Sequence, residues 1–249
     1  MTSKDIFSIN NKNIIISGGN GGIGSRLVKA FISRKAKVIS IDKNLIKFKH
    51  KNLYSVKFDF LKFNENKKEL ENYLSKFKKI DVLINCAGVT YPNNSEKYNS
   101  DDWNKTMTIN ATTYFELAQL TVKYMKNLKT SGSIINFTSI GGVLGFPNNP
   151  AYSASKGAVQ QLTKSLAIDL AKYNIKVNNI VPGYINTPMN HKSWKSKKER
   201  NKRSKRTILG RWGKASDLIG PAVFLSSDAS NYITGSDLVV DGGWLSKGF

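Results

Sequence analysis

The sequence has one cysteine, two histidines and six prolines in 249 residues. Cys86 cannot form an internal disulfide, and a lone thiol is typical of a chain in a reducing compartment. His50 and His191 lie outside any nucleophile motif, so neither a cysteine–histidine pair nor a metal site is predicted. No apolar run reaches 18 residues and the first 19 residues lack a signal-peptide pattern. We expect a soluble, cytoplasmic protein without a membrane partner.

Acidic residues are also scarce: 17 Asp and Glu face 39 Lys and Arg, a formal net charge of +22. Strongly basic proteins often bind nucleic acid. Here 33 of the basic residues are lysine and 26 residues are asparagine, spread along the chain, which indicates a compositional bias. Arginine, the residue that reads base edges in pairs of hydrogen bonds, is rare. No nucleic-acid partner is expected, although residues 192–206 concentrate nine basic residues and one acid.

Short runs rich in Val and Ile alternate with longer amphipathic segments. Strands are predicted at 13–17, 37–41, 53–58, 80–84, 133–137, 175–180 and 237–240, and helices at about 22–34, 64–78, 101–129, 151–172 and 215–227. Strands this apolar, separated by helices, indicate a parallel sheet covered on both faces. The fold class is therefore α/β, with a seven-stranded doubly wound parallel sheet of the Rossmann type. No linker or repeat suggests a second domain, so one domain spanning 1–249 is expected.

The first predicted strand runs into the glycine-rich stretch 17-SGGNGGIGS-25. Glycines between a strand and a helix let the backbone approach a pyrophosphate, whose charge then meets the helix N-terminus. The second strand ends in Asp42, a carboxylate suited to a ribose 2′-hydroxyl and repulsive to a 2′-phosphate. NAD is therefore expected as cofactor in preference to NADP, although the neighbouring Lys43 weakens that preference.

Tyr152 and Lys156 are four residues apart in a predicted helix, so their side chains share one face. A free phenol titrates near pH ~10. An ammonium group nearby stabilises the phenolate and lowers the pKa. The spacing alone is also typical of an ordinary amphipathic helix, and only the rest of the chain distinguishes the two readings.

Five ordered motifs resemble those of the short-chain dehydrogenase/reductase family, and the resemblance covers nearly the whole chain. They are Ser17-Gly18 with Gly22 and Gly24, 85-NCAG-88, the Asn110 that ends 107-MTIN-110, Ser139 with Tyr152 and Lys156, and 182-PGYINTPM-189. Ser17 replaces the family's commoner Thr and Cys86 stands at a variable position. The resemblance implies an NAD(P)-dependent oxidoreductase that interconverts a secondary alcohol and a ketone.

The resemblance also implies roles for single residues. Tyr152 would exchange a proton with the substrate oxygen, and Lys156 would lower the pKa of Tyr152 and hold the nicotinamide ribose. Ser139 would hydrogen-bond the substrate oxygen, and Asn110 would anchor a water chain to solvent. The cofactor would contact Gly18, Asn20, Gly22, Ile23, Gly24, Asp42, Asp59, Phe60, Asn85, Ala87, Gly88, Tyr152, Lys156, Pro182, Gly183, Ile185 and Thr187. Structural roles remain open for Asp59 as a turn residue and for Asn85 and Gly88 after the fourth strand.

The substrate is less well indicated. Residues 211–245 resemble the C-terminal part of the family's sugar-acid dehydrogenases, of the gluconate 5-dehydrogenase and 2-deoxy-gluconate 3-dehydrogenase type. A substrate lid is expected at about 188–210, where Lys192, Lys195, Arg200 and Arg203 would attract an anionic substrate unless the cluster is only compositional bias. A 3-oxoacyl-[acyl-carrier-protein] reductase is an alternative, as is a non-catalytic member that senses dinucleotide or binds nucleic acid. By the family resemblance we expect a homotetramer.

Overall fold

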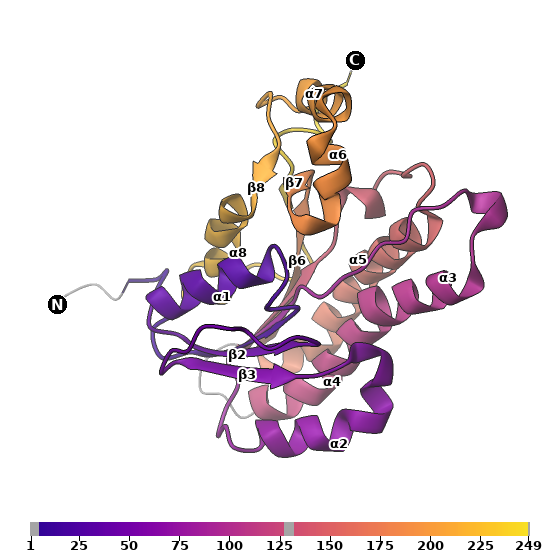
Figure 1. Cartoon of the computed structure of the whole chain (residues 1–249). Helices are drawn as coiled ribbons and strands as arrows, with labels where there is room; N and C mark the ends of the chain where they lie inside the picture. Colours follow the sequence, from indigo (N-terminus) through magenta and orange to yellow (C-terminus); the bar gives the residue numbers. More distant parts are fainter. Residues whose placement is uncertain (1–4, 127–131, 249) are drawn as a thin grey trace.

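The computed structural model describes residues 5–126 and 132–248. Seven of the described strands form one parallel sheet in the order β3-β2-β1-β4-β5-β6-β9 (Figure 1). The strands are β1 (Asn13–Ser17), β2 (Lys37–Asp42), β3 (Leu53–Lys57), β4 (Val82–Asn85), β5 (Gly132–Phe137), β6 (Ile175–Pro182) and β9 (Asp237–Val240). The order reverses between β1 and β4, which is where a doubly wound sheet places its ligands. The predicted fold class is confirmed.

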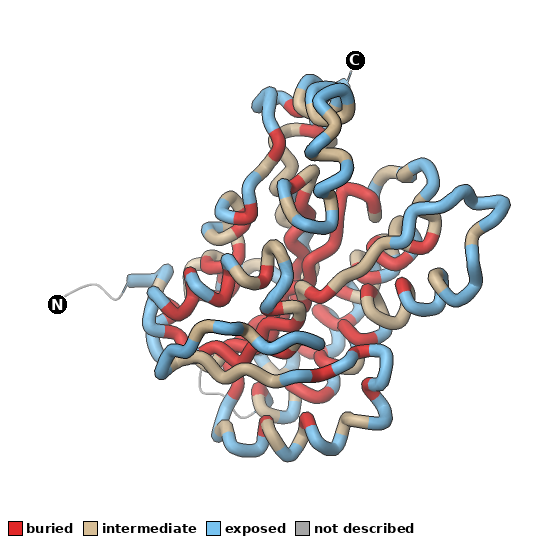
Figure 2. Tube along the Cα trace, viewed as in Figure 1, coloured by how far each residue is buried: buried red, intermediate tan, exposed pale blue. Residues whose placement is uncertain are grey.

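Alternation along β1 shows how the two faces of the sheet are covered. Ile14 and Ile16 pack in one apolar cluster with helices α1 (Gly24–Ser33) and α8 (Ile219–Ser226). Ile15 packs in a second cluster with helices α2 (Phe63–Leu74), α4 (Thr113–Met125) and α5 (Pro150–Leu170). Because successive side chains of a strand point to opposite faces, both faces of the sheet are core. Figure 2 shows the sheet as the buried interior with exposed residues on the outer turns of the helices.

The predicted helix at 101–129 is interrupted in the structure. Helix α3 (Ser100–Met107) passes through a π-helical turn at Thr108–Thr112 into α4, and residues 127–129 lie outside the described residues. A π turn holds one extra residue per turn and rotates the helix that follows it. Asn110, in the π turn, and Tyr114, four residues later in α4, are both fully or almost fully buried.

The segment expected to be a lid is helical. After the short strand β7 (Ile185–Asn186) come a 3₁₀ turn at Pro188–Asn190 and helices α6 (His191–Lys195) and α7 (Lys197–Arg206). Strand β7 pairs with β8 (Gly213–Lys214), so the two ends of this segment meet. In Figure 1 the two helices project beyond the main sheet. Within residues 5–126 and 132–248, no helix has the length and apolar character needed to cross a membrane.

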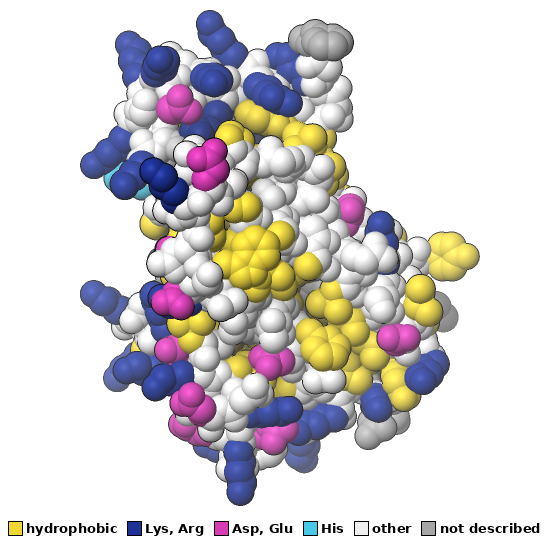
Figure 3. All heavy atoms as spheres, turned by 90° about the vertical axis from the view of Figure 1, so that its right-hand side faces the viewer, with side chains coloured by type: hydrophobic (Ala, Val, Ile, Leu, Met, Phe, Trp, Pro, Cys, Tyr) yellow, Lys and Arg dark blue, Asp and Glu magenta, His cyan; other side chains and the backbone are white. Residues whose placement is uncertain are grey.

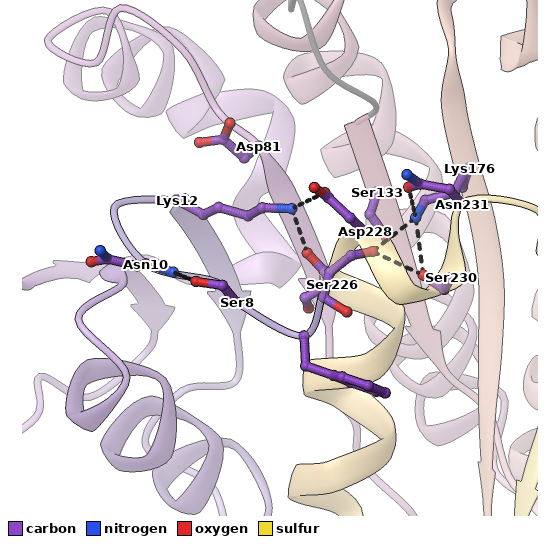
Figure 4. Close-up of polar contacts among 12 residues, drawn as sticks. Ser8, Asn10, Lys12, Asp81, Ser133, Lys176, Ser226, Asp228, Ser230 and Asn231 are labelled. Carbon is purple, nitrogen blue, oxygen red and sulfur yellow. Dashed lines mark hydrogen bonds and ion pairs between the residues drawn. The ribbon is translucent and has the colours of Figure 1, made fainter. Parts of the chain in front are cut away.

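Two lysines, at the amino ends of strands β1 and β6, stabilise the C-terminal end of α8 (Figure 4). Lys12 Nζ donates to the carbonyl oxygen of Ser226 at 2.9 Å. The buried Lys176 Nζ donates to Ser230 Oγ at 2.9 Å and to the carbonyl oxygen of Ser227 at 3.2 Å. Cations at a helix C-terminus satisfy its free carbonyl groups and its negative dipole end. Burial and the nearby Lys12 lower the pKa of Lys176 to about 8.

Candidate active site

A cavity of about 530 Å³ lies at the carboxyl ends of the strands and brings together most of the predicted site residues. Its wall combines the loop between β1 and α1, the ends of β2, β4 and β5, helix α5, and the segment after β6. Sixteen of the predicted cofactor residues line it: Gly18, Asn20, Gly22, Ile23, Gly24, Asp42, Asp59, Phe60, Ala87, Gly88, Tyr152, Lys156, Pro182, Gly183, Ile185 and Thr187. Ser139 lines it as well.

The glycines of the first loop are required by close backbone approaches. Gly18 has φ +68°, and a Cβ there would lie 2.7 Å from Ala87 Cα. A Cβ on Gly22 would lie 2.8 Å from Thr187 Cβ, and one on Gly24 would strike the Gly18 carbonyl group. Helix α1 begins directly after this loop and Ile23 provides no side-chain cap. The free N–H groups of its first turn and the narrow glycine cradle fit the pyrophosphate of a dinucleotide.

Two carboxylates also line the cavity. Asp42 Oδ2 accepts a hydrogen bond from Asn20 N and Oδ1 accepts one from Asn44 N, both at 3.0 Å. Asp59 Oδ1 accepts from Leu61 N at 3.0 Å and so caps a 3₁₀ turn. Both carboxylates line the cavity, together with Lys43. The Asp42 carboxylate, oriented by two backbone N–H groups, is placed to accept hydrogen bonds from a ribose.

Ser139 and Tyr152 meet at the floor of the cavity. Ser139 lies two residues after the end of β5, and its Oγ accepts a hydrogen bond from Gly141 N at 3.0 Å. Its hydroxyl also hydrogen-bonds to that of Tyr152, in the first turn of α5. Burial raises the pKa of Tyr152, and the hydrogen bond from Ser139 partly opposes that rise. Two hydroxyl groups therefore converge on one point of the cavity wall.

Lys156 corrects one expectation from the sequence. Its Nζ donates to the carbonyl oxygen of Phe137 at 2.7 Å and to the hydroxyl oxygen of Tyr114 at 3.3 Å, and lies 5.9 Å from the centroid of the Tyr152 ring. The ammonium is thus directed at β5 and α4, and burial raises the pKa of Tyr152. Burial also lowers the pKa of Lys156 itself, to about 8.

Asn110 is fully buried in the π turn and is not among the lining residues. Its Oδ1 accepts from Val89 N at 2.8 Å, and its Nδ2 donates to the Val89 carbonyl at 3.0 Å and to Ser155 Oγ at 3.1 Å. Ser155 Oγ in turn donates to the Tyr152 carbonyl at 2.8 Å. Asn110 therefore ties the strand end after β4 to the first turn of α5.

The structure corrects the expectation that Asn85 contacts the cofactor, because Asn85 is not among the residues that line the cavity. Asn85 is fully buried, and its Nδ2 donates to Asn136 Oδ1 at 2.9 Å and to the Tyr114 carbonyl at 3.3 Å. It therefore joins β4 to β5 and α4 within the core. Further lining residues that were not among the predicted contacts include Cys86, Val89, Tyr91, Ile109, Met189 and Asn190. Cys86, Ile109 and Met189 lie inside the motifs, at positions to which the family resemblance gives no role, and the other three of these lie outside them. Burial raises the pKa of the Cys86 thiol to about 12.

Known proteins with this arrangement are oxidoreductases. A family model described as enoyl-(acyl carrier protein) reductase matches residues 18–245. A 2-dehydro-3-deoxy-D-gluconate 5-dehydrogenase of Bacillus subtilis (strain 168) is 37% identical over 98% of each chain. This chain belongs to the short-chain dehydrogenase/reductase family. It is an NAD(P)-dependent oxidoreductase, as the motifs predicted.

Solved structures of this family share the whole fold with the dehydrogenase described here. A 4-hydroxyisoleucine dehydrogenase complexed with NADH has a TM-score of 0.90 at 34% identity, covering 96% of this chain and 100% of that one. A gluconate 5-dehydrogenase from Burkholderia cenocepacia J2315 in complex with NADP and tartrate also has a TM-score of 0.90, at 29% identity over 98% and 99% of the chains. Structural relatives thus bind either dinucleotide.

Substituting Gly18 tests the glycine cradle. We expect Gly18→Ala to abolish detectable dinucleotide binding, because the left-handed φ costs a residue with a Cβ about 1–2 kcal/mol and the methyl group strikes Ala87. Gly220→Ala, in α8 with open space around the added Cβ, is the matched control and should leave binding unchanged while stabilising the helix by about 0.5–1 kcal/mol. NADH affinity, measured by fluorescence titration alongside thermal unfolding, checks both. Normal binding by folded Gly18→Ala would show that the cradle is not needed.

Proposed function

We propose that this dehydrogenase interconverts a secondary alcohol and a ketone on a sugar acid or related carbohydrate, using NAD(H) and Tyr152 as general acid/base. The observation that carries the proposal is the convergence of the Ser139 and Tyr152 hydroxyls at the cavity floor, beside the glycine cradle. The relatives named 2-dehydro-3-deoxy-D-gluconate 5-dehydrogenase and gluconate 5-dehydrogenase support the substrate class.

The chain's own residues supply binding and proton transfer. A bound nicotinamide supplies the acceptor or donor of the hydride. Ser139 holds the substrate oxygen by a hydrogen bond, and Tyr152 takes the hydroxyl proton during oxidation or gives its own proton to the oxygen during reduction. Lys156 holds the cofactor ribose from the neighbouring turn of α5. Asn110 keeps the first turn of α5 in place through Ser155, and the water chain to solvent is proposed to begin at Asn110.

Replacing Tyr152 by Phe removes the proposed acid/base and little volume. We expect kcat with a sugar acid and NAD(H) to fall by about 10²–10⁴, with NADH affinity retained. In the unchanged enzyme, oxidation should accelerate as pH rises, because it needs the phenolate and burial raises the pKa of Tyr152. Reduction needs the phenol and should be favoured near neutral pH.

The assay is a matched set of oxidations and reductions over sugar acids, simple polyols and acetoacetyl thioesters. Turnover of a sugar acid that is lost in Tyr152→Phe supports the proposal. Full activity of the Tyr152→Phe enzyme contradicts the assigned acid/base. Preferential reduction of thioesters with NADPH would instead support the 3-oxoacyl-[acyl-carrier-protein] reductase alternative.

The preference for NAD over NADP is proposed to depend on the charge of Asp42. Two backbone hydrogen bonds hold its carboxylate at the cavity wall, where a 2′-phosphate would meet a like charge. We expect Asp42→Asn to lower the ratio of NAD to NADP use at least about tenfold, since only the charge changes. Asp59→Asn, which also removes a carboxylate from the cavity wall, should weaken both cofactors alike. An unchanged ratio in Asp42→Asn, measured as kcat/KM with each cofactor, would assign selectivity elsewhere.

Residues 188–210 are proposed to form the substrate lid, because Pro188, Met189 and Asn190 line the cavity and α6 and α7 follow directly. The cations of the lid differ in how far they are exposed. Lys192 and Lys195 are exposed, and Figure 3 shows Lys and Arg side chains covering the end of the molecule formed by these helices. Arg203 is partly buried 4.6 Å from the Tyr184 ring centroid, and its Nη2 pairs with Glu199 at 3.3 Å.

Steering of an anionic substrate is therefore assigned to the exposed lysines of the lid. Replacing Lys192 and Lys195 by Gln should lower kcat/KM for a sugar acid a few-fold at low salt and reduce its dependence on ionic strength. The same two charges removed at the exposed Lys68 and Lys78, far from the lid in sequence, serve as the control. Equal kcat/KM and an equal salt dependence in both double variants would leave compositional bias as the explanation of the basic lid.

A homotetramer in the cytoplasm is proposed for this dehydrogenase. Large apolar side chains remain exposed on helices and a strand that the family resemblance assigns to subunit contacts: Trp103 on α3, Phe115 on α4, Ile168 on α5 and Val239 on β9. Figure 3 shows hydrophobic patches on the face to which α3 and α5 belong. A monomeric mass in solution would contradict this assembly. Salt-sensitive retention of RNA without enzymatic activity would favour the non-catalytic alternative.

A further inference from the structure

A buried tyrosine outside the proposed chemistry contacts Lys156. Tyr114 lies in the first turn of α4, is 1% exposed and is among the largest fully buried side chains. It is not among the residues that line the cavity, so its hydroxyl group does not meet substrate directly. Burial raises the pKa of Tyr114 well above its ordinary value, so it remains a neutral phenol.

The Tyr114 hydroxyl occupies the space between two strand ends and the lysine. It lies 2.8 Å from the Ala87 carbonyl oxygen after β4 and 3.2 Å from the Phe137 carbonyl oxygen at the end of β5. A phenol has one proton to donate, so it bonds to one of these carbonyls at a time. Its oxygen keeps lone pairs for Lys156 Nζ, which donates to it at 3.3 Å and to the Phe137 carbonyl at 2.7 Å.

The surroundings of Lys156 offer its positive charge few other partners. The titratable groups that face it are Cys86 after β4, Tyr114 on α4 and Tyr152 on α5. Burial raises the pKa of all three, so at neutral pH they carry no charge. The ion pairs among residues 5–126 and 132–248 include none with Lys156. The ammonium therefore depends on the Phe137 carbonyl and the Tyr114 hydroxyl for stabilisation.

We propose that Tyr114 is a positioning residue that holds Lys156 Nζ at the carboxyl end of β5 and keeps the ammonium group charged at working pH. Asn110, in the π turn, and Tyr114, at the start of α4, are four residues apart and both buried, so they lie on the same side of the helix. Asn110 then positions the backbone of α5 and Tyr114 positions its lysine. The catalytic consequence rests on the proposed function, in which Lys156 holds the ribose beside Tyr152.

The test measures the titration of Lys156 in the folded, cofactor-free protein by ¹³Cε NMR of labelled lysine. Two lysines, Lys156 and Lys176, should titrate near pH 8, and Lys176→Met assigns them. Tyr114→Phe should move the Lys156 midpoint down by about one to two pH units, because a hydrogen bond to the charged form is lost. Lys176 should not move. An unchanged or raised Lys156 midpoint in folded Tyr114→Phe would overturn the proposal.

Thr121→Val is the matched control on the same helix. Thr121 is fully buried and donates within its own helix, to the carbonyl oxygen of Leu117 at 2.8 Å, two turns beyond Tyr114. Loss of its hydroxyl should therefore leave the Lys156 midpoint in place. Tyr114→Met, which also loses the hydroxyl while filling the space with a flexible side chain, replaces Tyr114→Phe if that variant does not fold. If Thr121→Val moved the Lys156 midpoint as far as Tyr114→Phe does, the shift would come from a general loosening of α4, and the proposal would be overturned.

Enzyme assays separate this proposal from the proposed function. With a ketone that is reduced, the alkaline fall of kcat/KM for reduction should begin about one to two pH units lower in Tyr114→Phe, with a smaller effect at pH 6. A moved NMR midpoint in a protein that turns over no panel substrate would uphold Tyr114 and reject the substrate class. Normal turnover of a sugar acid with an unmoved Lys156 midpoint would uphold the substrate class and reject the positioning role of Tyr114.

Discussion

The close contact between the loop after β1 and the end of β4 determines where everything else in the site can lie. Ser17 Oγ accepts hydrogen bonds from Cys86 N at 3.1 Å and from Ala87 N at 3.3 Å. Gly18, with a left-handed φ, then passes so near Ala87 that no Cβ fits between them. Because the two strand ends are held this tightly, the first turn of α1, Asp42 and the floor of the cavity meet at the carboxyl ends of the strands.

Burial is the second constraint, and it controls the chemistry of the titratable groups. It raises the pKa values of Cys86, Tyr114 and Tyr152 and lowers that of Lys156 to about 8. Each shift follows from the cost of placing a charge away from water. Hydrogen bonds from Ser139 and to Tyr114 act against these shifts. Among the residues that the structure describes, the buried titratable groups of the cavity therefore have neutral partners and not ion pairs around them.

The strands and the motif residues could be predicted from the sequence because each is encoded locally. Short apolar runs mark the strands, Ile14–Ile16 in β1 and Ile134–Ile135 in β5, and glycines at close spacing mark the turn into α1. The lid helix α7 could not be predicted in this way, since Lys197–Arg206 contains no apolar residue. Its arginines pack against aromatic rings distant in sequence, as Arg203 does against Tyr184 and Arg206 against Trp244.

By itself the sequence determined the α/β fold and the order of the motifs, because strand periodicity and motif spacing are local properties, and its resemblance to the family pointed to Ser139, Tyr152 and Lys156. Only the tertiary structure decided where those side chains are directed and how they titrate. It placed Asn85 in the core, directed Lys156 toward Phe137 and Tyr114, and made Tyr152 more basic through burial. The physical reason is that desolvation and hydrogen bonding depend on neighbours from other elements, which packing alone brings together.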